Sequence, residues 1–390
     1  MFGIRTYNKI AEAGLAVFED GEYRVGEDVE DPDGIILRSH DLNDMELNPR
    51  LKVIARAGTG VNNIPVEACT ERGVVVFNTP GANANSVKEL VISGLLLSSR
   101  RIYDGLAWVK SLDPSTEDVA KLVEKQKKAY AGPEIYGKTL GVIGLGAIGV
   151  MVANAASALG MTVVGCDPYI SVESAWGLSR SVERARNLQS LLSRSDYVTI
   201  HVPLSENTQH YLNHETLSQM KPGARLLNFA RGGLVDDDAL LTAIDKGIVS
   251  YYVTDFPDTK LLGNERILPI PHLGASTPEA EENCAVMAAR QLRDYIETGN
   301  IVNSVNFPKC IMPYTGRERL LIGNRNIPNM VGQVTRILAE GNINILDLVN
   351  HHKGDVAYNI IDVDDNLSSE HIEAIKNIDG IIMVRHLPNR

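Results

Sequence analysis

The sequence predicts an α/β protein with two Rossmann-like domains, each built on a doubly wound parallel sheet, followed by a small C-terminal βαββαβ unit with a ferredoxin-like fold. Up to about residue 305, short apolar runs alternate with amphipathic stretches, which is typical of parallel α/β architecture. The runs are apolar throughout, as expected of strands that helices cover on both faces. Beyond residue 318, the order of the elements changes to βαββαβ.

Length and composition agree with a multidomain globular protein. The chain has 390 residues, too many for one ordinary core, and it is 44% hydrophobic and 22% charged. No run reaches the roughly 18 apolar residues of a membrane helix, and Met1–Tyr7 lacks the pattern of a secretory signal. A net charge of -11 disfavours contact with a phosphate backbone. We therefore expect a cytoplasmic protein that binds neither membrane nor nucleic acid.

The four cysteines predict neither a disulfide framework nor a structural zinc site. They lie far apart along the chain and form no C-x-x-C pair. We expect no bound metal and ordinary core or surface thiols at Cys69, Cys166, Cys284 and Cys310.

Two α/β blocks and a third unit divide the chain. The first block, before about residue 90, contains apolar runs at 34–37 and 53–55, and the second extends from Lys138 to about His272. Two prolines and a glycine in 306–316 predict a linker. We expect helices at 86–101, 116–130, 331–340 and 369–376, and strands of the third unit at 319–323, 343–350, 356–363 and 380–385.

A glycine-rich turn in the second block has the surroundings of a dinucleotide site. The apolar strand 140–143 leads into the turn, and the alanine-rich stretch 150–159 follows it as a helix. Glycines permit a tight turn and close approach of the backbone, so that pyrophosphate oxygens meet the free N–H groups at the N-terminus of the helix. The glycines of this turn are Gly144, Gly146 and Gly149.

The next strand supplies the acidic residue that such a site requires. The apolar run 161–166 ends in Asp167, 18 residues after Gly149. Its carboxylate would bind the adenosine ribose diol and would repel the 2′-phosphate of NADP. The sequence therefore predicts NAD as the cofactor.

Two further strand ends supply residues suited to the oxidation of a hydroxy acid. The run 226–230 ends in Arg231, and the run 267–271 ends in His272; ligands bind at the carboxyl ends of strands in open α/β sheets. Histidine titrates near neutral pH and can accept the hydroxyl proton while a hydride leaves. A guanidinium binds a carboxylate through two hydrogen bonds and polarises the developing carbonyl. We therefore predict His272 as the acid/base and Arg231 as the group that binds the substrate carboxylate.

Six segments of residues 1–305 resemble motifs of the D-2-hydroxyacid dehydrogenase family. Within it, 56–60 and the C-terminal unit are most similar to the D-3-phosphoglycerate dehydrogenases, which open serine synthesis. The resemblance implies 3-phosphoglycerate as substrate and self-association into at least a dimer. We place a substrate domain at 1–88 and 278–305, an NAD domain at 89–277, a linker at 306–317 and a regulatory domain at 318–390. The six segments are Arg56–Ile64, Asn78–Pro80, Gly137–Gly141, His201–Leu204, Arg231–Gly233 and Pro271–Thr277.

The resemblance also implies roles for individual residues. Arg56 would bind the carboxylate or phosphate of the substrate, and Gly58 and Gly60 would shape its pocket. Arg38 is a second candidate for the phosphate, although a solvated arginine at a strand end explains it equally well. Besides the glycines of the turn, the implied contacts with NAD are Thr79, Ala147, Ile148, Asp167, Val202, Ala230, Arg231, Asp255, His272 and Gly274.

The chain departs from the family at the acid that pairs with the catalytic histidine. Members usually carry a glutamate five residues after the aspartate of an Asp-Val-Phe-x-x-Glu-Pro segment. Here Asp255 is followed by Phe-Pro-Asp-Thr-Lys, so the valine is missing and the glutamate is absent. A carboxylate beside a catalytic histidine raises the pKa of that histidine and fixes its tautomer. We predict that Asp258 takes this role.

The C-terminal unit resembles an ACT domain, a module that binds amino acids where two copies pair. In serine-inhibited members, contacts with serine come from the loop after the first strand and from a position after the first helix. These positions are Asn324, Asn326 and Asn344, of which Asn324 stands where a histidine is common. Amides offer the donor and acceptor that an amino acid requires. We predict L-serine as an effector; asparagines that cap loops in a dimerisation domain are the alternative.

Two other functions remain open on the sequence alone. A reductase of hydroxypyruvate or glyoxylate would use the same cofactor site with an unphosphorylated substrate. An NAD-sensing interaction protein, like the C-terminal-binding-protein corepressors, would share the fold. The ACT-like unit argues against the second of these, because it belongs to amino-acid metabolism.

Overall fold

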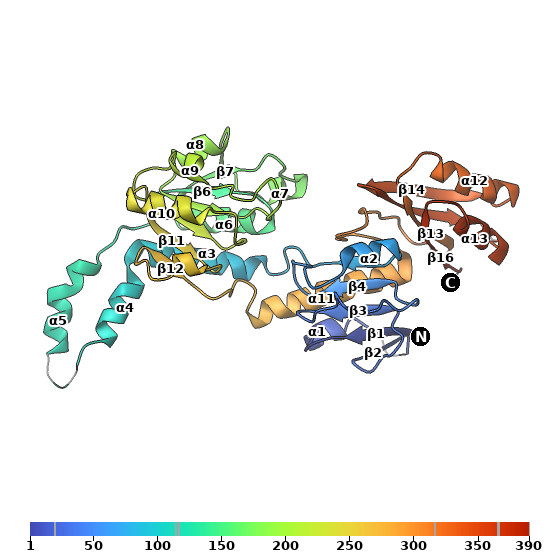
Figure 1. The fold of residues 1–390 in the computed structure, drawn as a ribbon, viewed down its shortest axis with the longest axis horizontal. Helices are drawn as coiled ribbons and strands as arrows, with labels where there is room; N and C mark the ends of the chain where they lie inside the picture. Colours follow the sequence, from blue (N-terminus) through green and yellow to red (C-terminus); the bar gives the residue numbers. More distant parts are fainter. Residues whose placement is uncertain (19–20, 114, 116–117, 316, 365–366, 390) are drawn as a thin grey trace. The chain divides into compact units, whose positions relative to one another are not determined.

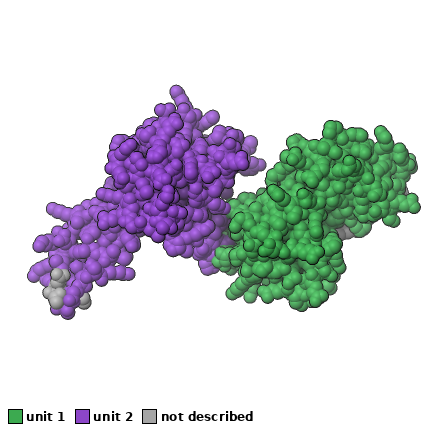
Figure 2. All heavy atoms as spheres, in the orientation of Figure 1, with its two compact units in different colours: residues 1–82, 281–390 green, residues 83–280 purple. Residues whose placement is uncertain are grey.

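The chain forms two compact units, which Figure 2 distinguishes by colour. A computed structural model describes residues 1–18, 21–113, 115, 118–315, 317–364 and 367–389. Unit 1 comprises residues 1–82 and 281–390, and unit 2 comprises residues 83–280. Residues 116 and 316, which bound a predicted helix and the predicted linker, lie outside the described residues. None of the described helices has the length and apolar character needed to cross a membrane.

The first sheet of unit 1 has five parallel strands in the order β2-β1-β3-β4-β5 (Figure 1). Its central strands are apolar because side chains on both faces are buried. The long helix α11 packs into the same core through Ala288, Leu292 and Ile296. The strands are β1 (Phe2–Thr6), β2 (Tyr23–Gly26), β3 (Gly34–Leu37), β4 (Val53–Arg56) and β5 (Val75–Phe77), and the helices are α1 (Glu12–Leu15), α2 (Val66–Glu71) and α11 (Pro278–Thr298).

Unit 2 is built on a parallel sheet in the order β12-β11-β10-β9-β6-β7-β8. The order reverses between β6 and β9, and ligands of open α/β sheets bind at such a switch point. Two apolar clusters fill the unit. The strands are β6 (Thr139–Ile143), β7 (Thr162–Cys166), β8 (Glu183–Arg184), β9 (Tyr197–Ile200), β10 (Ala224–Asn228), β11 (Val249–Thr254) and β12 (Ile267–Pro269).

The helices of unit 2 fall into those that cover the sheet and a pair that projects from it. In Figure 1, α4 and α5 extend away from the rest of the unit, and neither buries a residue. The helices are α3 (Ala84–Arg100), α4 (Ile102–Lys110), α5 (Val119–Gln126), α6 (Ala147–Ala158), α7 (Val172–Gly177), α8 (Leu188–Leu192), α9 (His214–Leu217) and α10 (Asp237–Asp245), with 3₁₀ turns η1 (Lys127–Tyr130) and η2 (Thr259–Leu261).

The C-terminal module, residues 318–387, has the predicted βαββαβ order and an antiparallel sheet in the order β14-β15-β13-β16. Together with the two parallel sheets, it confirms the predicted fold class. The elements are β13 (Glu318–Arg325), α12 (Met330–Glu340), β14 (Ile345–Lys353), β15 (Val356–Val363), α13 (Ser369–Lys376) and β16 (Ile381–Leu387).

The sheet of the C-terminal module is covered on both faces. On one face, Leu320 and Ile361 form a cluster with side chains of α12 and α13. On the other, Leu321 and Tyr358 join the core that α11 shares with the parallel sheet of unit 1. Every residue of β15 is consequently buried. The module is therefore an integral part of unit 1.

Three side chains of the module bind the backbone at the end of α11. Arg385 donates to the carbonyl oxygens of Tyr295, at 3.0 Å, and of Ile296. Arg319 donates to Thr298 O at 2.9 Å, and the Tyr358 hydroxyl donates to Gly299 O at 2.9 Å. The last carbonyls of a helix lack partners within it and form the negative end of its dipole. We call Arg319, Tyr358 and Arg385 the α11 clamp.

Arg319 also pairs with a buried carboxylate and with the segment predicted to be a linker. Its guanidinium forms two hydrogen bonds with Asp362, Nε to Oδ1 at 2.6 Å and Nη2 to Oδ2 at 2.8 Å. It donates further bonds to Met312 O and Pro313 O. Both charged side chains are almost completely buried. A bidentate pair with additional carbonyl acceptors is the arrangement in which buried charges are tolerated.

Candidate functional site

The glycine turn after β6 has the shape that its sequence predicts. Gly144 has a φ of +87°, and a Cβ there would lie 2.7 Å from His201 O. A Cβ on Gly149 would overlap the carbonyl oxygen of Gly144. Both obstacles are backbone atoms, so the first and third glycines are required by the fold of the turn itself.

The second glycine faces open space. A Cβ on Gly146 would have no neighbour within 4 Å. Gly146 is also the N-cap of α6 and provides no side-chain hydrogen bond to the N–H groups of the first turn, to which Ala147 and Ile148 belong. The N-terminus of this helix can therefore accept an anion that approaches the backbone closely.

Asp167 is held beside this turn. Its Oδ2 accepts a hydrogen bond from Leu145 N at 2.8 Å, and its Oδ1 accepts one from Tyr169 N at 2.8 Å. The carboxylate is half-buried at the end of β7, where it adds a negative charge next to the open side of the turn.

The neighbouring strand β9 supports the turn from its other side. His201 N donates to Ile143 O at 2.7 Å, and Val202 Cγ1 lies close to Gly144. The His201 Nε2 lies 3.0 Å from the Thr199 hydroxyl. Burial lowers the pKa of His201 to about 4, so this imidazole is neutral at physiological pH.

Arg231 follows β10 on a turn that Asn228 organises. The Asn228 amide donates to Arg231 O at 2.9 Å and accepts from Ala230 N at 3.1 Å. The Arg231 guanidinium donates from Nη1 to Ala230 O at 2.7 Å and is half-buried. The turn thus presents the guanidinium at the carboxyl end of the sheet.

His272 and Asp255 come from the neighbouring edge strands. Thr254 of β11 pairs with Pro269 of β12, which brings the residues after both strands to one edge of the sheet. His272 is exposed, and the ring of Phe256 lies against it with centroids 4.5 Å apart. Asp255 is only 1% exposed, and neither of its carboxylate oxygens has a hydrogen-bond partner among the described residues.

The surroundings of Asp255 associate it with both predicted catalytic residues. Burial raises the pKa of Asp255, and His272 and Arg231 act against that shift. A Cβ on Gly274 would lie 3.5 Å from Asp255 Oδ2. The buried carboxylate at this edge is therefore Asp255.

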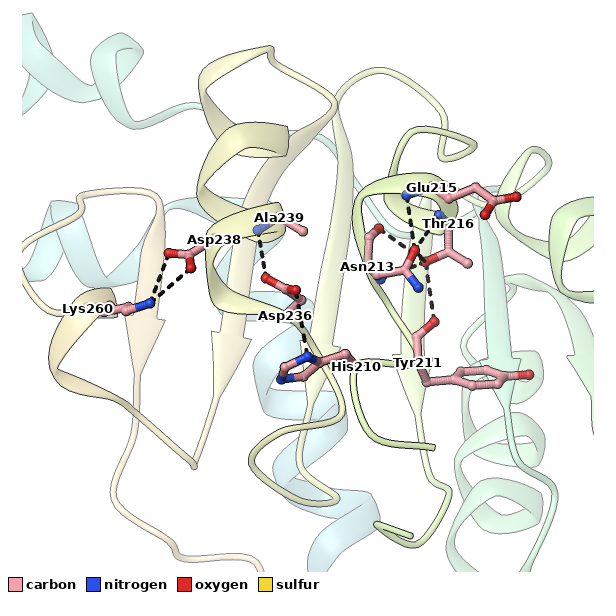
Figure 3. A network of polar contacts seen from close by, with 9 residues as sticks. All are labelled: His210, Tyr211, Asn213, Glu215, Thr216, Asp236, Asp238, Ala239 and Lys260. Atoms are coloured by element: carbon pink, nitrogen blue, oxygen red, sulfur yellow. Dashed lines mark hydrogen bonds and ion pairs between the residues drawn. The ribbon is translucent and has the colours of Figure 1, made fainter. Parts of the chain in front are cut away.

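Asp258 lies elsewhere. Its exposed carboxylate accepts a hydrogen bond from Lys260 N at 3.1 Å and so caps η2. Lys260 in turn binds both carboxylate oxygens of Asp238 at 3.0 Å, which ties this segment to the first turn of α10 (Figure 3). Asp236, the N-cap of the same helix, faces His210 in this network. The geometry thus favours Asp255 over Asp258 as the acid beside His272.

The predicted substrate residues of unit 1 lie at the carboxyl ends of three adjacent strands. Arg38 follows β3, Arg56 ends β4, and Thr79 follows β5. Arg56 Nε donates to Arg38 O at 2.9 Å, and Thr79 N donates to Gly58 O at 3.0 Å. Gly60 is half-buried and comes directly after the bend at 57–59 that follows β4.

The absence of a side chain at Gly58 leaves room for the Arg56 guanidinium in the position that it occupies. A Cβ at Gly58 would be 2.6 Å from Arg56 Nη1. Arg38 Nη1 lies 2.7 Å from Glu281 Oε1 of α11. Unit 1 therefore presents two guanidinium groups and one carboxylate at the carboxyl edge of its sheet.

Comparison with known proteins identifies the family to which this geometry belongs. Residues 93–274 match the family described as D-isomer specific 2-hydroxyacid dehydrogenase, NAD binding domain. D-3-phosphoglycerate dehydrogenase of Haemophilus influenzae is 33% identical over 367 residues, which make up 91% of this chain and 86% of that protein. The chain belongs to the D-isomer specific 2-hydroxyacid dehydrogenases. The resemblance inferred from the motifs and the NAD-binding character of the second block are thereby confirmed.

Other members of the family are longer than the segment they share with this chain. D-3-phosphoglycerate dehydrogenase of Methanocaldococcus jannaschii is 35% identical over 85% of this chain, and the match spans 62% of that protein. The match spans 46% of the relative from Synechocystis. Among solved structures, NAD+-bound 3-phosphoglycerate dehydrogenase of Entamoeba histolytica is 25% identical with a TM-score of 0.62, covering 78% of this chain and 98% of that one.

The sequence does not predict the positions that two residues take in the candidate site. Asp255 was predicted to contact NAD, whereas its burial beside His272 depends on the pairing of β11 with β12, to which a sequence pattern gives no direct access. Glu281 lies in a run of acidic residues on α11, which reads as a solvated helix face. The only sequence signal for Asp255 in this role was that a catalytic histidine needs a carboxylate nearby.

Of the three predicted effector residues, Asn324 and Asn326 lie at the end of β13, whereas Asn344 lies just before β14. Asn324 is buried, donating to Arg325 O at 2.6 Å and accepting from Asn359 at 2.8 Å. Asn326 is exposed beside the β14–β15 turn and donates to Gly354 O at 3.1 Å. Asn344 is exposed at the other end of the sheet, and its N–H donates to Asp364 Oδ1 at 2.8 Å.

Proposed function

We propose that this family member catalyses the NAD-dependent oxidation of D-3-phosphoglycerate to 3-phosphohydroxypyruvate, the first step of L-serine synthesis. The observation that carries the proposal is the gathering of Arg231, Asp255 and His272 after three adjacent strands, at the carboxyl edge where the glycine turn also lies. A carboxylate-binding group, an acid/base and a buried acid are the groups that oxidation of a 2-hydroxy acid requires.

The glycine turn fits NAD in three respects. The first and third glycines allow the turn, the second leaves room for a pyrophosphate, and the N-terminus of α6 has no side-chain cap. Asp167 would bind the ribose diol, with Val202 and Ala230 on neighbouring strand ends. When bound, NAD would supply the hydride acceptor for the reaction.

Each catalytic side chain has a distinct role in the proposed reaction. His272 accepts the proton of the substrate hydroxyl as the hydride leaves, and it returns the proton in the reverse direction. Asp255 stabilises the imidazolium that forms and orients the ring, because an unpaired buried carboxylate favours a positive charge beside it. Arg231 binds the carboxylate of the substrate and polarises the bond that becomes the carbonyl.

The phosphate is assigned to unit 1. Arg56 binds the backbone carbonyl of Arg38, and both arginines act on the same buried thiol of Cys284. Two guanidinium groups at this edge suit a phosphate dianion better than they suit the uncharged end of an unphosphorylated acid. The relatives named D-3-phosphoglycerate dehydrogenase support the same substrate.

Absorbance of NADH at 340 nm tests the assignment. The expected result is turnover with 3-phosphoglycerate and NAD, a kcat/KM at least tenfold higher than with glycerate, and little turnover with NADP. A preference for hydroxypyruvate or glyoxylate over the phosphorylated keto acid would favour the reductase alternative. NAD binding without turnover of any of these acids would favour an interaction protein.

We further propose that the module acts as an ACT domain that binds L-serine between two copies. Asn326 and Asn344 lie at opposite ends of strands of eight residues, about 25 Å apart, so one serine cannot contact both in one copy. Antiparallel pairing of two exposed β14 edges would bring the Asn344 end of one copy to the Asn326 end of the other. Titration of L-serine against the initial rate of the full-length chain tests this; the absence of any effect would reject it.

Self-association is proposed to involve the projecting helix α4. Its exposed apolar side chains include Tyr103, at 63%, and Leu106, at 51%. Such a face is stabilised when another copy covers it. Sedimentation should give at least a dimer, Leu106→Glu should give a smaller assembly than the wild type, and Leu262→Glu, at an exposed site elsewhere in unit 2, should leave the assembly intact. A monomeric wild-type chain would refute the proposal.

A further inference from the structure

One ion pair of unit 1 lies within the proposed phosphate site. Arg38 and Glu281 are 38% and 44% exposed, and their closest atoms, Nη1 and Oε1, lie 2.7 Å apart. The two residues come from distant parts of the sequence, the end of β3 and the first turn of α11. The pair is therefore formed by the tertiary fold, at a place where a ligand can reach both charges.

The neighbouring groups show that this pair belongs to a single cluster of charges. Cys284 lies one helical turn after Glu281 and is buried. Burial raises the pKa of the Cys284 thiol; Thr79, Arg38 and Arg56 act in the opposite direction, and Glu281 reinforces the shift. Both arginines and the glutamate thus act electrostatically on one buried thiol. The arginines and Glu281 therefore lie close enough to influence the same bound anion.

The electrostatic consequence follows from the sign of these charges. Glu281 places a negative charge beside the guanidinium group of Arg38 and so lowers the positive potential that the arginines offer to a ligand. A phosphate that binds Arg38 must share the guanidinium with the glutamate or displace it. A dianion is affected more strongly than a monoanion, because the repulsion between two anions grows with the product of their charges.

We propose that Glu281 is a specificity-determining residue that competes with the substrate phosphate for Arg38 and so limits the preference for phosphorylated over unphosphorylated 2-hydroxy acids. The inference rests on the proposed function, since it concerns the same substrate site. Glu281 acts on binding through Arg38 and takes no part in proton or hydride transfer.

The conservative variant Glu281→Gln removes the charge and keeps the size and a hydrogen-bond acceptor. The KM for 3-phosphoglycerate should fall about three- to fivefold, the range expected for one partly exposed ion pair, while kcat changes less than about twofold. The KM for glycerate should change less than that for 3-phosphoglycerate. Glu282→Gln is the matched control, because Glu282 is exposed on the same helix and has no hydrogen bond or ion pair in the described part of the chain. It should leave both KM values unchanged.

A double-mutant cycle shows whether the effect passes through Arg38. In the Arg38→Gln background, Glu281→Gln should no longer lower the KM for 3-phosphoglycerate. An unchanged or higher KM in the single variant would overturn the inference, and so would an equal gain with and without Arg38. These results would leave the proposed function intact if the wild-type chain oxidises 3-phosphoglycerate. A wild-type chain without that activity would overturn the proposed function and, with it, the reason to place a phosphate at Arg38.

Discussion

The glycine turn of unit 2 and the α11 clamp of unit 1 both lie at a helix terminus, and they differ in whether the unsatisfied backbone groups of that terminus are left open or hydrogen-bonded. At the N-terminus of α6, glycines leave the backbone N–H groups open, and the obstacles to larger residues are backbone atoms within or next to the turn. At the C-terminus of α11, the carbonyl groups are covered by Arg319, Tyr358 and Arg385, which come from 21 to 90 residues further along the chain.

The difference separates a terminus kept open for a ligand from one closed for stability. An open helix terminus has unsatisfied groups that bind an ion of the opposite charge. A terminus closed by guanidinium groups has no such capacity, but it fixes the C-terminal module to α11 within unit 1. The module therefore cannot be removed to test regulation without exposing the end of α11 and the core beneath it. Regulation is better tested in the full-length chain.

The largest expected effect is the loss of the buried arginine of the clamp. Arg319→Met leaves Asp362 buried without its partner and should destabilise unit 1 by about 3–5 kcal/mol. Urea unfolding followed by circular dichroism measures this loss. Both tryptophans, Trp108 and Trp176, belong to unit 2, so their fluorescence should report a transition that moves less.

Two further variants make this prediction specific. Arg325→Met, at the exposed end of the same strand, should change the free energy of unfolding by less than about 0.5 kcal/mol. Arg319→Met combined with Asp362→Leu should recover most of the lost stability, since no unpaired charge remains. If Arg319→Met were as stable as the wild type, the clamp would have no role in holding the module.

The same contrast explains why the sequence predicts the glycine turn but does not predict the clamp. The glycine turn is encoded within about 30 consecutive residues, and the strand, glycines, helix and Asp167 were all identified from their spacing. The clamp depends on contacts between residues far apart in sequence, and 306–317 therefore read as a linker although Phe307 and Cys310 are buried. The assignment of the acid beside His272 depends on the same kind of contact, because strand pairing, which spacing does not reveal, places Asp255 at the edge of the sheet where His272 lies.

The second prediction separates the two kinds of glycine in the turn. Gly149→Ala places a Cβ against a backbone carbonyl and should destabilise unit 2 by about 3 kcal/mol. The added Cβ of Gly146→Ala contacts no protein atom, so this variant should keep the stability of the wild type. Its affinity for NAD should fall at least tenfold, or by about 1.4 kcal/mol. Thermal unfolding and titration with NAD measure the two effects. Equal loss of stability in both variants would mean that the open side of the turn is not kept for a ligand.

The third prediction concerns pH. The pKa of His201 is about 4 in the folded chain against an ordinary value of 6.5, so below pH 6.5 the unfolded chain takes up a proton that the folded chain excludes. The free energy of unfolding is therefore highest above pH 6.5 and falls as the pH is lowered toward 4. Between pH 7 and 5 this loss amounts to about 2 kcal/mol. Tryptophan fluorescence during urea unfolding reports unit 2, and His201→Gln should lose this part of the pH dependence. An identical pH dependence in the variant would exclude His201 as its source.

The role proposed for Asp255 can be tested by the pH dependence of kcat/KM for 3-phosphoglycerate oxidation in the wild type, Asp255→Asn and Asp258→Asn. Asp255→Asn should lower turnover and move the acid limb of the profile to lower pH, because the imidazolium of His272 loses its buried anion. Asp258→Asn, altered at the exposed cap of η2, should behave like the wild type. An acid limb that moves in Asp258→Asn and stays in place in Asp255→Asn would show that Asp255 is not the acid beside His272.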